Sequence, residues 1–69
     1  MSSNVYAISE IAGSSTVSIE EAIENALVRA RKTLRNLDWF EVTEIRGWIN
    51  GGEVGHFQVS MKIGFRLED

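Results

Sequence analysis

The residues of this 69-residue chain that best suit ligand chemistry are two tryptophans and two polar residues, an arginine and a glutamine, in the same half of the sequence. Trp39 and Trp48 offer flat indole rings, and a planar heteroaromatic ring stacked on an aromatic side chain gains roughly 1–3 kcal/mol. Gln58 carries both a donor and an acceptor, so it can match the edge of an imide-like ring. Arg46 can stack on a ring or pair with an anion. Together these residue types predict a stacking platform for a flat heteroaromatic ligand.

The same tryptophans also suit a protein–protein interface, where tryptophan is enriched. The two interpretations are compatible, because a pocket at a symmetry axis is both an interface and a binding site. Glu41 and Glu44 are candidates for holding a cation, but two acids on a strand are usually solvated. The residues alone leave these alternatives open.

Residues for catalysis are scarce in this sequence. His56 is the only candidate base, and nothing places a nucleophile beside it. Gly51 and Gly52 fall in a hairpin turn rather than ahead of a helix, so they form no phosphate-binding loop. The chain has no cysteine, which excludes disulfides and disfavours a structural zinc site. We therefore expect no catalytic residues, no metal ligands and no enzyme.

The elements that must position the candidate residues follow from hydrophobic periodicity. Residues 5–12 are rich in β-favouring side chains and predict a strand, which turn residues at 13–16 would end. Ser18 and Glu21 have capping-box spacing, which predicts the start of a helix. Apolar residues then recur at spacings of three and four as far as Leu37, with Asn36 as the expected stop.

From position 38 onward the sequence predicts a long β-hairpin. Residues 54–67 alternate with a period of two, with apolar side chains on one face. The Asn-Gly-Gly run at 50–52 is a strong turn signal, and a three-residue loop there would pair Arg46 with His56. A two-residue loop would put the isoleucines of the first arm opposite polar residues, so we reject it.

The first arm of the hairpin changes its alternation partway along. Phe40 and Val42 are apolar at even positions, whereas Ile45 and Ile49 are apolar at odd ones. Both pairs can face the core only if one extra residue lies between them, so we predict a β-bulge within residues 42–45. The bulge would bring six side chains to the face away from the helix: Trp39, Glu41, Glu44, Arg46, Trp48 and Gln58.

The element order predicts an α+β fold, in which a three-stranded antiparallel sheet packs one helix on one face. Residues 1–69 should form a single domain. A domain of this size buries only about 60% of its unfolded surface, so its stability is marginal. Without cysteines, self-association is the remaining way to bury more apolar surface.

The charge balance bears on the kinds of partner. Ten acidic and seven basic residues give a formal net charge of −3. The sequence has no basic stripe, which disfavours a nucleic-acid partner. No apolar run approaches the ~20 residues that span a bilayer. The N-terminus lacks the pattern of a secretory signal. We therefore expect a cytoplasmic protein with no membrane and no nucleic-acid partner.

Several short sequence blocks lie at characteristic spacings along the chain. They are Asn-Val-Tyr at 4–6, Ser-Ile-Glu-Glu-Ala-Ile at 18–23, Leu-Asp-Trp-Phe-Glu-Val at 37–42, Arg-Gly at 46–47, His-Phe-Gln-Val at 56–59, and Lys-Ile-Gly-Phe-Arg-Leu-Glu at 62–68. With these blocks the chain resembles the dodecins, small flavin-binding proteins of bacteria and archaea, over essentially its whole length. It departs from them at Trp48, since bacterial members commonly carry a histidine after the Arg-Gly pair.

The resemblance implies a β-α-β-β unit in which the sheet wraps around the helix, and twelve copies of this unit form a hollow spherical dodecamer. It implies flavins bound in pairs at subunit interfaces, between Trp39 side chains of two-fold-related copies. Gln58 would hydrogen-bond the flavin's pyrimidine edge, and we expect the indole of Trp39 to point outward beside it. Arg46 would lie beside the pocket, and Glu44 at a pocket position that is acidic in some members.

The implied role is storage and photoprotection of flavin rather than turnover. FMN is the expected ligand, with riboflavin and FAD as alternatives. Two other functions stay open. One is a structural or scaffolding oligomer that binds no ligand. The other is a shell that binds coenzyme A, as some members do, and the basic residues Arg29, Lys32 and Arg35 would favour it.

Overall fold

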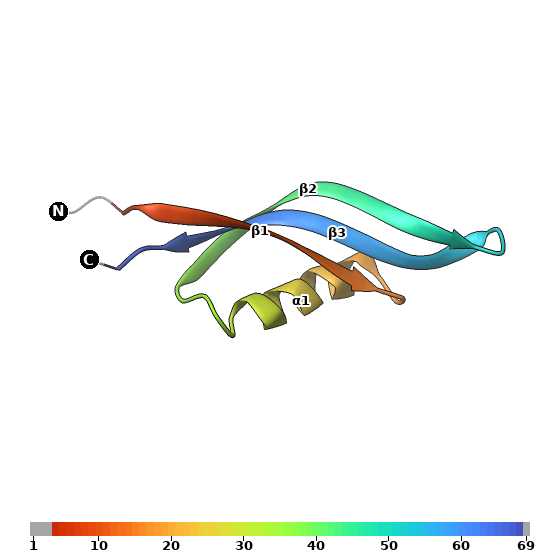
Figure 1. The fold of residues 1–69 in the computed structure, drawn as a ribbon, viewed down its shortest axis with the longest axis horizontal. Coiled ribbons are helices and arrows are strands. Elements are labelled where there is room, and N and C mark those ends of the chain that lie inside the picture. The colour runs from red at the N-terminus through yellow and green to blue at the C-terminus, as the bar shows by residue number, and fades with distance from the viewer. Residues whose placement is uncertain (1–3, 69) are drawn as a thin grey trace.

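The structure, a computed structural model, describes residues 4–68 and has the element order β-α-β-β (Figure 1). The strands form one antiparallel sheet in the order β1-β3-β2, so β3 is its central strand. The predicted fold, three antiparallel strands with one helix, is confirmed. No helix in the described part of the chain is long and apolar enough to cross a membrane. The elements are β1 (Tyr6–Ser15), α1 (Ile19–Ala30), β2 (Leu37–Asn50) and β3 (Glu53–Arg66).

The core lies between α1 and the two strands that it covers. The helix packs against β1 and β3 and does not contact β2. Three helix alanines face three apolar side chains of β3, and alanine allows a close approach because its side chain is only a methyl group. At Gly13 of β1 a Cβ would lie 2.1 Å from the carbonyl oxygen of Ala22, so this position needs glycine. The buried core residues are Ala22, Ala26, Ala30, Val59, Met61 and Ile63.

The link between β1 and α1 differs from the predicted one. Ser18 is the N-cap as expected, since its hydroxyl accepts from the backbone N–H of Glu21 at 3.0 Å. The Glu21 carboxylate instead accepts from the hydroxyl of Ser15. The predicted turn at 13–16 is wrong, because β1 continues through Ser15 and pairs there with β3.

The helix ends earlier than its apolar stripe suggested. It ends at Ala30, whereas the periodicity predicted a helix reaching the Asn36 stop. The apolar positions Leu34 and Leu37 still pack against the core, but from a loop and a strand. Asn36 adopts a left-handed φ of 60°, and its side-chain amide donates to the carbonyl oxygen of Arg66 at 3.2 Å. Asn36 therefore marks the entry into β2 rather than the end of the helix.

The hairpin closes through a two-residue loop at Gly51 and Gly52. Their φ angles are 61° and 83°, and two left-handed residues in a row match the twist of paired strands. The predicted three-residue loop is therefore wrong. Arg46 lies opposite Gln58 and not opposite His56.

Two of the three register shifts between β2 and β3 keep the apolar side chains of the hairpin on the helix side. The register shifts between Val42 and Glu44, which leaves one unpaired residue on β2 and confirms the bulge predicted from the change in alternation. A second shift between Trp48 and Ile49 adds a residue to β3 and was not predicted. It restores the alternation that the short loop would otherwise break, so Ile45 still shares the helix-side face.

β2 is the least covered element of the chain. Its residues 38–50 are all exposed, and the hairpin projects past the end of the helix (Figure 1). Its helix-side face carries Phe40, Val42, Ile45 and Ile49, which are between 38% and 82% exposed. An edge strand with this much exposed apolar surface is suited to cover by another molecule.

Candidate ligand-binding site

The candidate residues gather on the face of the sheet away from the helix, which we call the outer face. Val59, Met61 and Ile63 of β3 face the helix, so the even-numbered residues of β3 between 56 and 64 face outward. The predicted sharing of one face is confirmed by the register. The outward pairs between β2 and β3 are Trp39 with Gly64, Glu41 with Lys62, Glu44 with Ser60, Arg46 with Gln58, and Trp48 with His56.

Trp39 lies at the end of the outer face near the chain termini. A Cβ on Gly64 would lie 2.0 Å from Cε2 and 2.2 Å from Cζ2 of Trp39, so the indole occupies the space of the missing side chain. Gly64 is buried by this contact, while Trp39 remains 39% exposed. The role of Gly64 was missed in the sequence, although a glycine inside a strand often marks a close approach.

Glu44, Arg46 and Gln58 lie together in the other half of the outer face. The guanidinium of Arg46 forms an ion pair with the Glu44 carboxylate. Both side chains are more than half exposed, and exposed pairs of this kind contribute about 0–1 kcal/mol. The pair therefore holds Arg46 only weakly, and a ligand anion could compete for it. Gln58, directly opposite Arg46, is partly buried.

Trp48 and His56 form a stack beside this group. Their ring centroids lie 4.3 Å apart and their planes meet at 13°, so the rings are nearly parallel. The stack was not foreseen, because the register predicted from a three-residue loop placed His56 opposite Arg46 instead.

The two halves of the outer face are far apart within one copy. Gln58 lies six residues along β3 from Gly64, the partner of Trp39, which is about 20 Å at roughly 3.3 Å per residue. The expectation that Trp39 lies beside Gln58 is therefore wrong for a single chain. Both side chains do point to the outer face. A three-ring ligand is too short to contact both of them in one copy.

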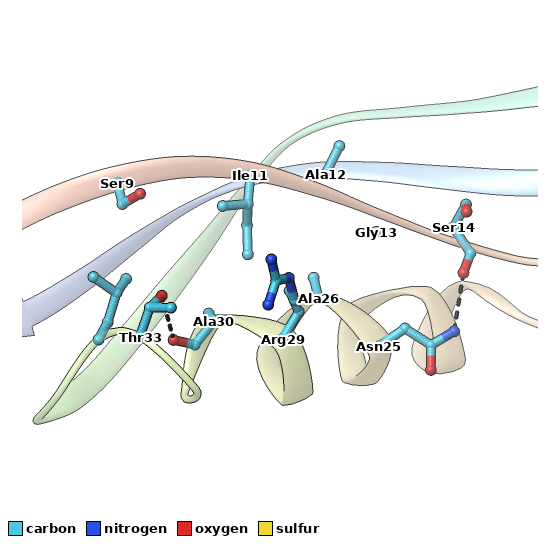
Figure 2. Close-up of a pocket in the computed structure, with 11 residues that line it drawn as sticks. Ser9, Ile11, Ala12, Gly13, Ser14, Asn25, Ala26, Arg29, Ala30 and Thr33 are labelled. Atoms are coloured by element: carbon cyan, nitrogen blue, oxygen red, sulfur yellow. Dashed lines mark hydrogen bonds between the residues drawn. The ribbon is translucent and has the colours of Figure 1, made fainter.

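A groove of about 340 Å³ lies elsewhere, between β1 and α1 (Figure 2). Ile11, Ala26 and Leu34 give it an apolar lining, and no aromatic side chain lines it. Asn25 at its rim donates to the carbonyl oxygen of Ser14 at 3.0 Å. Of the three basic residues that would favour coenzyme A, only the first, at position 29, lines this groove. The groove offers no aromatic side chain on which a flat ring could stack.

A polar recess lies near the chain termini, and its lining includes Tyr6 of β1, Asp38 of β2 and Arg66 of β3. The Tyr6 hydroxyl donates to Oδ2 of Asp38 at 2.9 Å. This hydrogen bond raises the pKa of Tyr6 above its ordinary value of 10.0. Desolvation and the charge of Asp38 add to the increase, while Asn4 and Arg66 oppose it. Within residues 4–68, no group of three or more histidine, aspartate or glutamate side chains is placed to hold a metal ion.

Comparisons with known proteins agree on one family. A family model described as Dodecin matches residues 5–68. The chain is 55% identical over 65 residues to a dodecin of Thermus thermophilus, with 94% of each chain covered. Dodecin from Streptomyces coelicolor has a similar structure, with a TM-score of 0.92, 51% identity, and coverage of 100% of this chain and 99% of its own. Dodecin from Streptomyces davaonensis gives a TM-score of 0.93 at 48% identity, with 99% and 100% covered.

Proposed function

The chain belongs to the dodecin family, and on that premise we propose that it binds flavin in order to store and photoprotect it. The supporting observation is the outer face of the sheet. Trp39 presents an indole held in place by a glycine, and Gln58 presents a carboxamide on the same face. An indole suits the flat ring system and a carboxamide suits its imide edge. Residues for turnover are not part of this arrangement, so the proposed role is binding and not catalysis.

The binding site is composed of two copies of the chain. Trp39 and Gln58 of one copy lie about 20 Å apart along the sheet, at roughly 3.3 Å per residue. A single ring system can therefore contact both residue types only if each comes from a different copy. Face-to-face association of two outer faces would bring the Trp39 end of one copy over the Gln58 end of the other. Binding of flavin and association of subunits thus become one event.

The exposed surface of β2 supports an oligomer larger than this pair. The outer faces would cover one side of β2, but its helix-side face carries a second row of exposed apolar side chains, from Phe40 to Ile49. Each chain therefore has two separate surfaces that need cover. Two different contacts per subunit build assemblies larger than a dimer, which fits the dodecamer of the family. We propose that assembly for this chain, in the cytoplasm.

FMN is the proposed ligand. Arg46 lies directly opposite Gln58, and its ion pair with Glu44 is exposed and weak. A phosphate can therefore compete for the guanidinium. Riboflavin would use the same stacking and hydrogen-bonding groups without that contact. Photoprotection follows from the indole, which donates an electron to the excited flavin and takes it back, so both groups end unchanged and no light is emitted.

A fluorescence titration of FMN with the purified protein tests this function. The emission of FMN should fall as wild-type protein is added, and Trp39→Ala should abolish most of the effect. Glu20→Gln, an exposed substitution on the helix, is the control and should quench like the wild type. Undiminished emission at saturating wild-type protein, with the oligomer still assembled, would point to a scaffolding shell without ligand.

A further inference from the structure

We propose that Ile8 of β1 is a further ligand-contacting residue of this site. Together with the indole of Trp39 it forms an apolar platform for the dimethylbenzene end of a flavin, the end opposite to the imide edge. This assignment rests on the proposed flavin-binding function and adds the orientation of the ring on that platform. Sequence reasoning missed Ile8, because a β-favouring residue in an expected strand gave no sign of a ligand.

Ile8 lies in one row with Trp39 across the three strands of the sheet. Gly64 of the central strand pairs with Trp39 of β2 on one side and with Ile8 of β1 on the other. Directly paired residues of antiparallel strands lie on the same face. Ile8 therefore belongs to the outer face, where its side chain is 57% exposed. Neighbouring strands are about 4.8 Å apart, so an indole that lies over Gly64 comes close to Ile8.

The indole of Trp39 lies over Gly64 with its face rather than its edge. The position of a Cβ on Gly64 is 2.0 Å from Cε2, 2.2 Å from Cζ2 and 2.5 Å from Nε1 of the ring. Cζ2 and Nε1 are both bonded to Cε2, and a group meeting the ring at its edge would be at least as close to them as to Cε2. One face of the indole thus lies on the sheet, and the opposite face points away from it, open for stacking.

The side chain of Ile8 continues the surface of this ring. Because Gly64 has no side chain, the indole lies directly on the backbone of β3, and the side chain that rises from β1 ends beside the ring. Along β1, Ile8 is the one aliphatic residue larger than alanine on the outer face. The next row of the sheet is charged, with Glu10, Lys62 and Glu41 side by side. The platform therefore ends at these charges.

The polarity of the flavin decides which of its ends lies on Ile8. Its ring system has three fused rings and the indole has two, so part of the ligand extends past the indole when the two stack. The imide edge needs a hydrogen-bonding partner, which we have proposed is Gln58 of a second copy. An aliphatic side chain would leave the imide groups unpaired, whereas the two methyl groups of the opposite end gain from being buried on it. The dimethylbenzene end therefore lies on Ile8.

Riboflavin and 7,8-didemethylriboflavin, which lacks the two methyl groups, test this contact by equilibrium dialysis. The wild-type protein should bind riboflavin more tightly, by roughly tenfold when both methyl groups are largely buried. In Ile8→Ala this preference should fall at least twofold, because the methyl groups lose their aliphatic partner. Ile8→Thr keeps a β-branched side chain in the strand and should lower the preference in the same way. Val28→Ala, which shortens an exposed aliphatic side chain of α1, is the control and should keep the wild-type preference.

The outcomes separate this contact from flavin binding itself. Equal affinities of the wild type for the two compounds, or a preference that falls less than twofold in either assembled Ile8 variant, would overturn the contact and leave flavin binding intact. A wild-type protein that binds neither riboflavin nor FMN would refute the proposed function, and the contact with it. Light scattering and circular dichroism show whether each variant is assembled and folded. Dissociation of both Ile8 variants would place this side chain between subunits and would also overturn the contact.

Discussion

At the scale of single residues, the position of Trp39 depends on a glycine, Gly64, which has no side chain. Trp39 lies in the space above Gly64 that a larger residue would fill. The identity and outward direction of Trp39 and Gln58 could be predicted from residue type and alternation. The contact of Trp39 with Gly64 could not be predicted, because alternation along a strand indicates the face on which a side chain lies but not the residue that it contacts there. The Trp48–His56 stack could not be predicted for a related reason. It requires Trp48 to pair with His56, and the residue types alone do not determine this register.

Substitution of Gly64 by alanine should displace the indole of Trp39. The added methyl would lie 2.0 Å from Cε2, so the ring must leave its position. We expect a loss of about 1–3 kcal/mol in the free energy of unfolding, as for other overpacked sites, and weaker binding of FMN. Urea denaturation and equilibrium dialysis measure the two effects.

Gly47→Ala on the same hairpin is the control for Gly64→Ala. There the nearest atom to a new Cβ, the carbonyl oxygen of His56, is 3.3 Å away and needs only a small shift. A Gly64→Ala protein with wild-type stability and affinity would show that Trp39 does not need its present position.

Tyr6 should ionise above its ordinary value of 10.0, because it donates a hydrogen bond to Asp38. A raised pKa in the folded state means that this contribution to stability is complete below pH 10 and is lost as pH rises through the folded-state pKa. The chain has one tyrosine, so the near-ultraviolet absorbance of tyrosinate reports this residue alone. Asp38→Ala should bring the pKa back toward 10.0, while Glu41→Ala should leave it raised. Equal titration curves for wild type and Asp38→Ala would contradict the assignment.

At the scale of the elements, local signals located the strands and the helix but not all of their ends. The bulge near position 43 was predictable, because a switch from even to odd apolar positions is visible in the sequence itself. The hairpin register was not, since the short Gly51–Gly52 loop is compensated by a second bulge that no alternation reveals. The helix end was missed because Leu34 packs on the core from a loop as well as it would from a helix.

Ser15 joins β1 to α1 and should be important for stability. Its hydroxyl donates to the Glu21 carboxylate and accepts from the backbone N–H of Val17 at 2.9 Å, and the residue is only 8% exposed. Ser15→Ala would remove these hydrogen bonds, and because both partners are exposed to water the cost should be about 0.5–1.5 kcal/mol in the free energy of unfolding. Urea denaturation measures it. Ser14→Ala, at the exposed neighbouring position, should cost much less, and equal losses in the two variants would refute this role.

At the scale of the whole molecule, the single chain is too thin to bury the apolar surface of both faces of its sheet. The described residues extend 56 Å along the longest axis and 14 Å along the shortest, so one helix and one sheet cover each other only in part. Both faces of β2 are left exposed. The separation of Trp39 from Gln58 agrees with the proposed two-copy site, because a second copy would complete a site divided between the two ends of one sheet face.

Association and ligand binding should therefore fail together. Ile45 is 54% exposed on the helix-side face of β2, away from Trp39 and Gln58. Ile45→Glu would place a charge in a subunit contact, and burying an unpaired charge is costly enough to dissociate the assembly. We expect a smaller native mass by light scattering and at least a tenfold loss in riboflavin affinity by dialysis. Thr16→Glu adds the same charge just ahead of α1, where the helix dipole favours it, and should keep both properties. A dissociated Ile45→Glu chain that still binds riboflavin with wild-type affinity would mean that one copy holds a complete site, because no partner would remain to supply the other half of it.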